Sequence, residues 1–132
     1  MAASDDVSAR TLAAVDALAL LLFVLVGVRS HHDVGGLSVF ARNAIPLEAA
    51  WFCVAMPMRA YRRPGIRTLL RTWVVAVPAG LLLRTLWVGS PTGVRLLTFL
   101  GVGLGFTLLF LLAGRWIATS IGRRVFPAGP RT

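Results

Sequence analysis

The sequence feature that most constrains the fold is an apolar run from Leu96 to about Gly114 that contains no charged residue. A helix needs about 20 consecutive, mostly apolar residues to cross the hydrocarbon core of a bilayer. A transmembrane strand would alternate apolar and polar residues, and this run shows no such alternation. The run therefore predicts a membrane-spanning α-helix.

Three further apolar stretches predict three further spans. The four expected spans are residues 11–28, 45–58, 73–88 and 96–117. The chain is 57% hydrophobic and 14% charged, whereas about a quarter of the residues of a soluble domain are charged. A core built from only 132 residues cannot hide so many apolar side chains from water. The sequence thus predicts an all-α, polytopic membrane protein with a four-helix transmembrane bundle over residues 11–118.

The second span is the shortest, and its beginning is the least defined. Pro46 suits the first turn of a helix, because proline lacks the amide hydrogen that would be left unpaired there. The preceding residues 37–44 form a short amphipathic piece. Two arrangements are open for it: it lies flat on the membrane surface, or it extends the second span upstream.

The arginines predict the orientation of the spans, because basic residues are enriched in cytoplasmic loops. Ten of them flank the same side of the membrane: Arg10, Arg59, Arg62, Arg63, Arg67, Arg71, Arg115, Arg123, Arg124 and Arg131. Only three, Arg29, Arg42 and Arg95, flank the other side. We therefore expect a multi-pass inner-membrane protein with both ends in the cytoplasm. Residues 1–10 would form a retained cytoplasmic segment, and residues 119–132 a basic, disordered tail.

The net charge of +9 does not indicate nucleic-acid binding. The basic residues interrupt apolar runs instead of forming one basic face, a pattern typical of topology signals and of contacts with anionic lipid head groups. The expected partners are membrane lipids, with either another membrane protein or further copies of the chain.

Three ionisable residues, Asp16, Glu48 and Arg84, fall inside the expected spans. Charges at membrane depth are costly, so each requires a partner or a watery cavity. From the rise of about 1.5 Å per residue, Asp16 lies roughly 8 Å from the cytoplasmic boundary and Glu48 roughly 5 Å from the outer one. Arg84 is also shallow on the outer side. The charges are therefore expected to form two layers.

In the outer layer, Arg29 and His31 join Glu48 and Arg84, and we expect Glu48 to pair with Arg84 or Arg29. Arg84 would bind Glu48 or a backbone carbonyl.

In the inner layer, Asp16 is expected to bind Arg71, Arg115 or a hydroxyl group, and not Arg84. Two roles are open for these charges. They hold the helices in register, or they line a polar cavity that binds an anion or relays protons.

Other features have simpler interpretations. His31 begins a His-His-Asp loop for which no third metal ligand is evident, so a solvated loop is expected. Cys53 is expected to be a small buried apolar residue. Gly101 and Gly105 form a GxxxG face that predicts close packing of the last span within the bundle. The tryptophans are expected mostly at the membrane interfaces: Trp51, Trp73, Trp87 and Trp116.

The sequence also resembles a known family. The residues that carry the resemblance are the run DALALLLFVLVGVRSHHD, the Ile-Pro-Leu at 45–47, the basic RAYRRP and the GLLLR at 80–84. They resemble the bacterial and archaeal domain-of-unknown-function family 3054 over roughly residues 12–118. The matching positions are Asp16, Gly27, His31, Pro46, Arg62, Arg63, Pro64, Gly80 and Arg84.

The resemblance implies a four-span membrane protein and no particular activity, substrate or cofactor. Glu48 departs from the family pattern, in which an apolar residue is expected after the proline. The resemblance therefore supports roles for Asp16 and Arg84 and none for a Glu48–Arg84 pair.

Three classes of function remain. We favour an accessory protein that assembles with another membrane component. The alternative is a small oligomeric transporter or channel that uses Asp16, Glu48 and Arg84. A lipid-modifying enzyme is disfavoured, because the sequence has no Ser-His-Asp set, HExxH motif, paired aspartates or Walker loop. No catalytic residue, cofactor or metal site is predicted.

Overall fold

The structure is a computed structural model, and it describes residues 7–31 and 35–125. Within these residues it contains four α-helices and no β-strand: α1 (Ala9–Ser30), α2 (Gly36–Ala55), α3 (Ile66–Val88) and α4 (Val94–Val125). The prediction of an all-α chain is confirmed. From the rise per residue, the helices range from roughly 30 Å in α2 to roughly 48 Å in α4.

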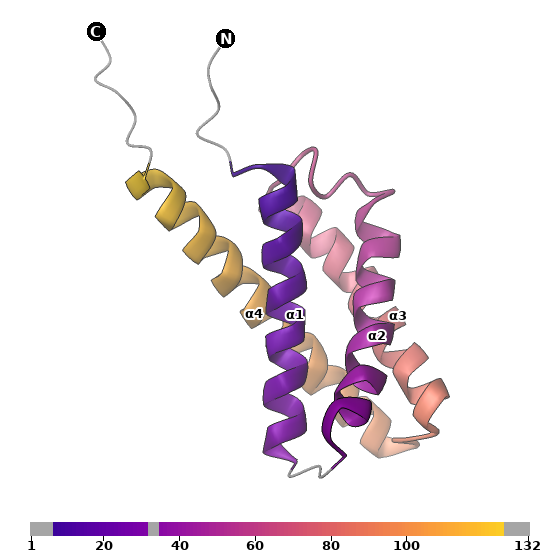
Figure 1. Cartoon of the computed structure of the whole chain (residues 1–132). Helices are drawn as coiled ribbons and strands as arrows, with labels where there is room; N and C mark the ends of the chain where they lie inside the picture. Colours follow the sequence, from indigo (N-terminus) through magenta and orange to yellow (C-terminus); the bar gives the residue numbers. More distant parts are fainter. Residues whose placement is uncertain (1–6, 32–34, 126–132) are drawn as a thin grey trace, which may run out of the picture.

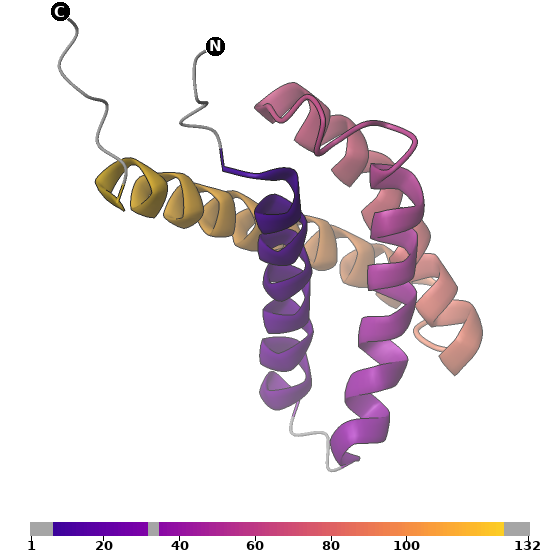
Figure 2. The ribbon, with the colours of Figure 1, turned by 45° about the horizontal axis from the view of Figure 1, so that its top comes forward.

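The helices form two closely packed pairs. α2 packs most extensively on α3, and α1 on α4, whereas the α1–α2 and α3–α4 interfaces are smaller. Figure 1 shows α4 crossing behind α1 at a steep angle, and the turned view in Figure 2 shows the same crossing. The last turns of α4 extend away from the other three helices in both views.

The two ends of the bundle carry different segments. One end holds the first turn of α1, the α2–α3 connection (residues 56–65) and the last turns of α4 (Figure 1). We call it the basic end, because most of the arginines lie there. The opposite end holds the end of α1, the start of α2 and the α3–α4 connection (residues 89–93), and we call it the cavity end.

Helices α1, α3 and α4 extend beyond the spans predicted from hydropathy. α3 begins at Ile66 instead of residue 73, and α4 continues to Val125. The predicted disorder from residue 119 onward is therefore wrong for residues 119–125, while residues 126–132 lie outside the described residues. The helix can continue because the chain has no proline between Val94 and Val125.

The structure also resolves the two arrangements that were open for α2. Residues 37–44 are helical and continuous with the apolar part of the span, so they extend the helix upstream. The sequence had suggested that Pro46 lies at the start of the helix, and this prediction is wrong because Pro46 lies inside α2. Proline removes one helical hydrogen bond at this point, and the extensive contact with α3 stabilises the helix around it.

Glycines allow close approach between α2 and α3 and between α3 and α4, although they are not the glycines that the sequence indicated. A Cβ added at Gly80 would lie 2.9 Å from the Leu47 Cα atom, and one at Gly103 would lie 2.6 Å from a Leu81 methyl group. A Cβ at Gly101 or Gly105 would meet no described atom within 4 Å. The prediction that Gly101 and Gly105 pack within the bundle is therefore wrong, because that side of α4 faces outward.

The outer surface of the bundle is apolar. Helices α1, α3 and α4 are long and apolar enough to cross a membrane, and α2 does not meet this criterion. Large side chains such as Leu86 and Leu97 are 80% and 70% exposed. Cys53, expected to be buried, also lies on the outside. Apolar surface of this extent is favourable only in lipid or against a partner.

Candidate functional site

A cavity of about 670 Å³ lies at the cavity end, between all four helices and the α3–α4 connection. Its walls are mostly apolar, with Phe23, Leu47 and Phe99 among them. The polar side chains that line it are His31, Asn43, Arg84, Ser90, Thr92 and Arg95. No carboxylate from residues 7–31 or 35–125 is in the lining, so these walls carry only basic and neutral polar groups.

Arg84 is held at the wall of this cavity by contacts from three segments. Its Nε atom donates to Asn43 Oδ1 of α2 at 2.8 Å, and its Nη1 atom donates to the Ser90 carbonyl. The guanidinium carbon also lies 5.1 Å from the centre of the Phe99 ring of α4, a cation–π contact. The prediction that Arg84 binds a backbone carbonyl is confirmed. These contacts fix the orientation of the guanidinium.

The remaining residues predicted for the outer layer are distributed differently. His31 is exposed at the end of α1 and lines the cavity, whereas Arg29 is exposed and does not line it. The other two residues of the His-His-Asp loop, 32 and 33, lie outside the described residues.

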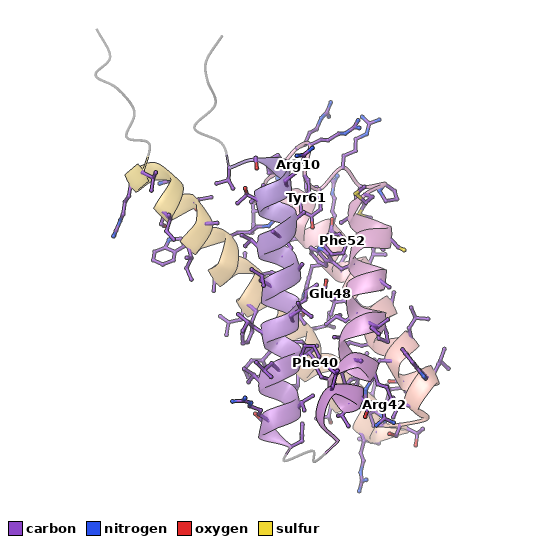
Figure 3. The ribbon with its side chains drawn as sticks, viewed as in Figure 1. Arg10, Phe40, Arg42, Glu48, Phe52 and Tyr61 are labelled. Carbon is purple, nitrogen blue, oxygen red and sulfur yellow. The ribbon has the colours of Figure 1, made fainter. Side chains whose placement is uncertain are left out.

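Glu48 lies deeper than predicted. Since α2 begins at Gly36, Glu48 stands roughly 18 Å along the helix, and Figure 3 shows it between α1 and α2 near the middle of the bundle. Its Oε1 atom is buried without a hydrogen-bond partner, and the carboxylate forms no ion pair with the described residues. The expected pairing of Glu48 with Arg84 or Arg29 is therefore wrong.

Asp16 anchors a second polar cluster near the basic end. Its side chain is fully buried, and both of its oxygens are bound by Arg115 of α4, at 3.0 Å from Nε and 2.7 Å from Nη2. Tyr61, from the α2–α3 connection, donates its hydroxyl to Asp16 Oδ2 at 2.9 Å. The Trp51 indole donates to that hydroxyl, also at 2.9 Å. The predicted pairing of Asp16 with Arg115 and a hydroxyl is confirmed, and Asp16 does not contact Arg84.

The hydrogen bonds of the Asp16 cluster stabilise the packing of the helices. Burial, and then the neighbouring Asp16 carboxylate, raise the pKa of the Tyr61 phenol above its usual range. The hydroxyl therefore stays protonated and remains a donor to Asp16. Because the bonded groups come from α1, α2, α4 and the α2–α3 connection, the cluster fixes these segments relative to one another.

Sequence reasoning missed most of the neutral partners. Asn43, Ser90 and Phe99 hold Arg84, and Trp51 and Tyr61 surround Asp16. Tyr61 is the only tyrosine of the chain and lies beside a basic stretch, but nothing in its spacing placed it next to Asp16. Trp51, expected at an interface, is fully buried.

Comparison with known proteins adds the family. The model of the family described as "Protein of unknown function (DUF3054)" matches residues 13–118. The chain belongs to this family. No curated protein and no solved structure matches it. With the apolar helices, this membership describes an integral membrane protein of unknown activity, and the matched residues include both the Asp16 cluster and the cavity.

Proposed function

We propose that the protein is a membrane-embedded binding or transport component that holds a small organic anion in the cavity beside Arg84 and Arg95. The observation that carries this proposal is the composition of the cavity, which is lined by basic groups and by no described carboxylate. Guanidinium groups bind carboxylate and phosphate through paired, charge-assisted hydrogen bonds. The proposal includes no chemical step.

The size and the walls of the cavity indicate the kind of anion. A volume of about 670 Å³ lies within the range of typical ligand pockets, about 300–1,000 Å³. The apolar walls formed by Phe23, Leu47 and Phe99 suit a hydrocarbon part, and the arginines suit an acidic head. A short-chain carboxylate or an alkyl phosphate combines both features.

The proposal includes four spans, with both ends in the cytoplasm of an inner-membrane protein. Support for a spanning α2 comes from its length of roughly 30 Å and its extensive packing along α3. Two of its polar residues, Asn43 and Glu48, point to neighbouring helices and not outward. The ten-to-three distribution of arginines supports the orientation.

An accessory role remains a second candidate, and one observation favours it. The last turns of α4 leave the bundle, and they expose Trp116, Ile117, Ile121 and Val125. This apolar surface is available to another membrane protein or to another copy of the chain.

The binding proposal is tested with purified full-length protein in mild detergent. Hexanoate and butyl phosphate should raise the melting temperature, whereas hexanol, which has no charge, should not. Arg95→Gln should abolish the increase because it removes a basic group from the cavity wall. Arg29→Gln is the matched control, since Arg29 lies at the same end and does not line the cavity. An equal response to hexanol, or an unchanged response of Arg95→Gln, would disprove anion binding in this cavity.

A further inference from the structure

The α2–α3 connection contains an arginine in an unusual backbone conformation. Arg59 has a φ angle of 56°, and among the described residues it is the only non-glycine residue with a positive φ angle. The Ala60 amide donates to the Ala55 carbonyl and the Arg59 amide to the Met56 carbonyl, both at 3.1 Å. This pair of bonds is a Schellman motif, in which the residue at the position of Arg59 is usually glycine.

The conformation is maintained although arginine is a poor residue for it. A Cβ atom is unfavourable in the left-handed region, so glycine would stabilise the same turn. The flanking Ala55 and Ala60 are buried, and they supply the apolar contact that accompanies such a helix end. The fold therefore imposes the turn, and an arginine at this position suggests a use for its guanidinium.

A cleft of about 490 Å³ lies next to this turn, between the first turns of α1 and the α2–α3 connection. Three arginines line it: Arg10 from α1, and Arg59 and Arg62 from the connection. Figure 3 shows Arg10 and Tyr61 together at this end of the bundle. None of the described residues that line the cleft is acidic.

Among residues 7–31 and 35–125, the carboxylate of Asp16 does not neutralise these arginines. Asp16 lies beneath Tyr61, which lines the cleft, and both oxygens of Asp16 are bound by Arg115. Tyr61 stays protonated, so it adds no negative charge. The cleft is therefore a basic pocket at the end of a membrane bundle, with apolar wall residues that include Met56 and Pro57.

We propose that this cleft binds the phosphate head group of an anionic phospholipid through Arg10, Arg59 and Arg62. The site is distinct from the anion cavity, which lies at the opposite end of the bundle. A lipid fits better than a soluble phosphate because the outer face next to the cleft is apolar. Met56 is 69% exposed there and offers a surface for acyl chains. Basic pockets between membrane helices on the cytoplasmic side are known to bind acidic lipid head groups.

The test uses delipidated full-length protein in mild detergent. Phosphatidylglycerol should raise its melting temperature by several degrees more than phosphatidylcholine with the same acyl chains, and native mass spectrometry should detect bound phosphatidylglycerol. Inorganic phosphate alone should produce no increase. An increase with inorganic phosphate equal to that with phosphatidylglycerol would overturn the lipid assignment.

The variant Arg59→Gly distinguishes the contribution of the Arg59 charge to lipid binding from the effect of its backbone strain on stability. Without lipid this variant should melt no lower than the wild type, because glycine suits the left-handed turn. Its response to phosphatidylglycerol should nevertheless fall to roughly half or less, since one guanidinium is lost. Arg59→Lys should keep most of the response.

The matched control is Arg63→Gln, which removes one charge from the same connection but not from the cleft wall. Arg63→Gln should retain the wild-type response, and Arg62→Gln should lose it. A wild-type response of Arg62→Gln would show that Arg62 does not bind the lipid, and equal losses in Arg62→Gln and Arg63→Gln would show that only overall charge attracts it; either result would overturn the site.

Discussion

At the scale of single residues, the Asp16 cluster shows how a charge can be kept inside a membrane bundle. Asp16 is fully buried, and the Arg115 side chain is 12% exposed, so neither charge is well solvated. The two parallel hydrogen bonds compensate for the lost water, and Tyr61 satisfies a further lone pair. A buried pair of this kind does not itself guarantee stability, but breaking it leaves one charge alone.

Removing one partner of this pair should therefore cost more than removing both. Asp16→Leu leaves Arg115 without its carboxylate and is expected to lower the free energy of unfolding by about 3–5 kcal/mol. The double variant Asp16→Leu/Arg115→Met should recover much of this loss. Denaturant titration in bicelles measures both. Arg29→Gln, at an exposed position, is the control and should be close to the wild type. Additive losses in the double variant would contradict the pairing.

Tyr61 gives a smaller, separate expectation. Tyr61→Phe removes the donor to Asp16 and the acceptor of the Trp51 indole, so the indole N–H is left buried without its partner. The expected loss is about 1–3 kcal/mol, which is smaller than for Asp16→Leu because the ion pair remains. The same titration measures it, with quenching of tryptophan fluorescence to report access of water to Trp51. A variant as stable as the wild type would show that the Tyr61 hydroxyl contributes nothing to the free energy of unfolding.

At the scale of the elements, the sequence predicted the existence of the helices better than their limits. Hydropathy located all four helices, because each needs an apolar stretch. It could not locate the start of α2, because the residues before Pro46 mix apolar side chains with Ser38, Arg42 and Asn43 and form no continuous apolar run. This difference moved Glu48 to the middle of the bundle. Asp16 was placed correctly because α1 begins close to its predicted start.

The α2–α3 contact provides a test of the helix packing. Gly80→Ala would place a Cβ atom 2.9 Å from the Leu47 Cα atom, which is backbone and cannot move aside without separating the helices. We expect a loss of about 1–3 kcal/mol, typical of overpacking in a tight core. Gly101→Ala is the matched control, because the added methyl group meets no described atom, and its higher helix propensity favours folding. Equal unfolding midpoints for the two variants would show that α2 and α3 are not closely packed at Gly80.

At the scale of the whole molecule, two helix pairs with smaller interfaces between them form the bundle. The cavity lies between all four helices at the cavity end, and the Asp16 cluster joins α1 and α4 to α2 and the α2–α3 connection near the basic end. α4 is roughly 48 Å long, and a bilayer core is about 30 Å thick, so α4 must tilt or project if it crosses. Its steep crossing angle in Figures 1 and 2 agrees with a tilted helix. Such an arrangement could not be read from hydropathy, which reports length and apolarity but not angle.

The number of spans determines which side of the membrane each site faces. Single cysteines in a Cys53→Ala background test it in intact cells with a membrane-impermeant maleimide. If α2 crosses the membrane, Ser38→Cys and Thr92→Cys at the cavity end should be labelled from outside, and Arg63→Cys at the basic end should be labelled only after the inner membrane is permeabilised. These positions are exposed in the structure, so burial within the protein does not explain a lack of labelling. If Ser38→Cys and Arg63→Cys become labelled on the same side, α2 does not cross and the chain has three spans. In that case α1, which precedes α2 in the chain, and α3, which follows it, would cross the membrane in opposite directions. The cavity and the lipid cleft could then no longer lie at opposite faces of the membrane.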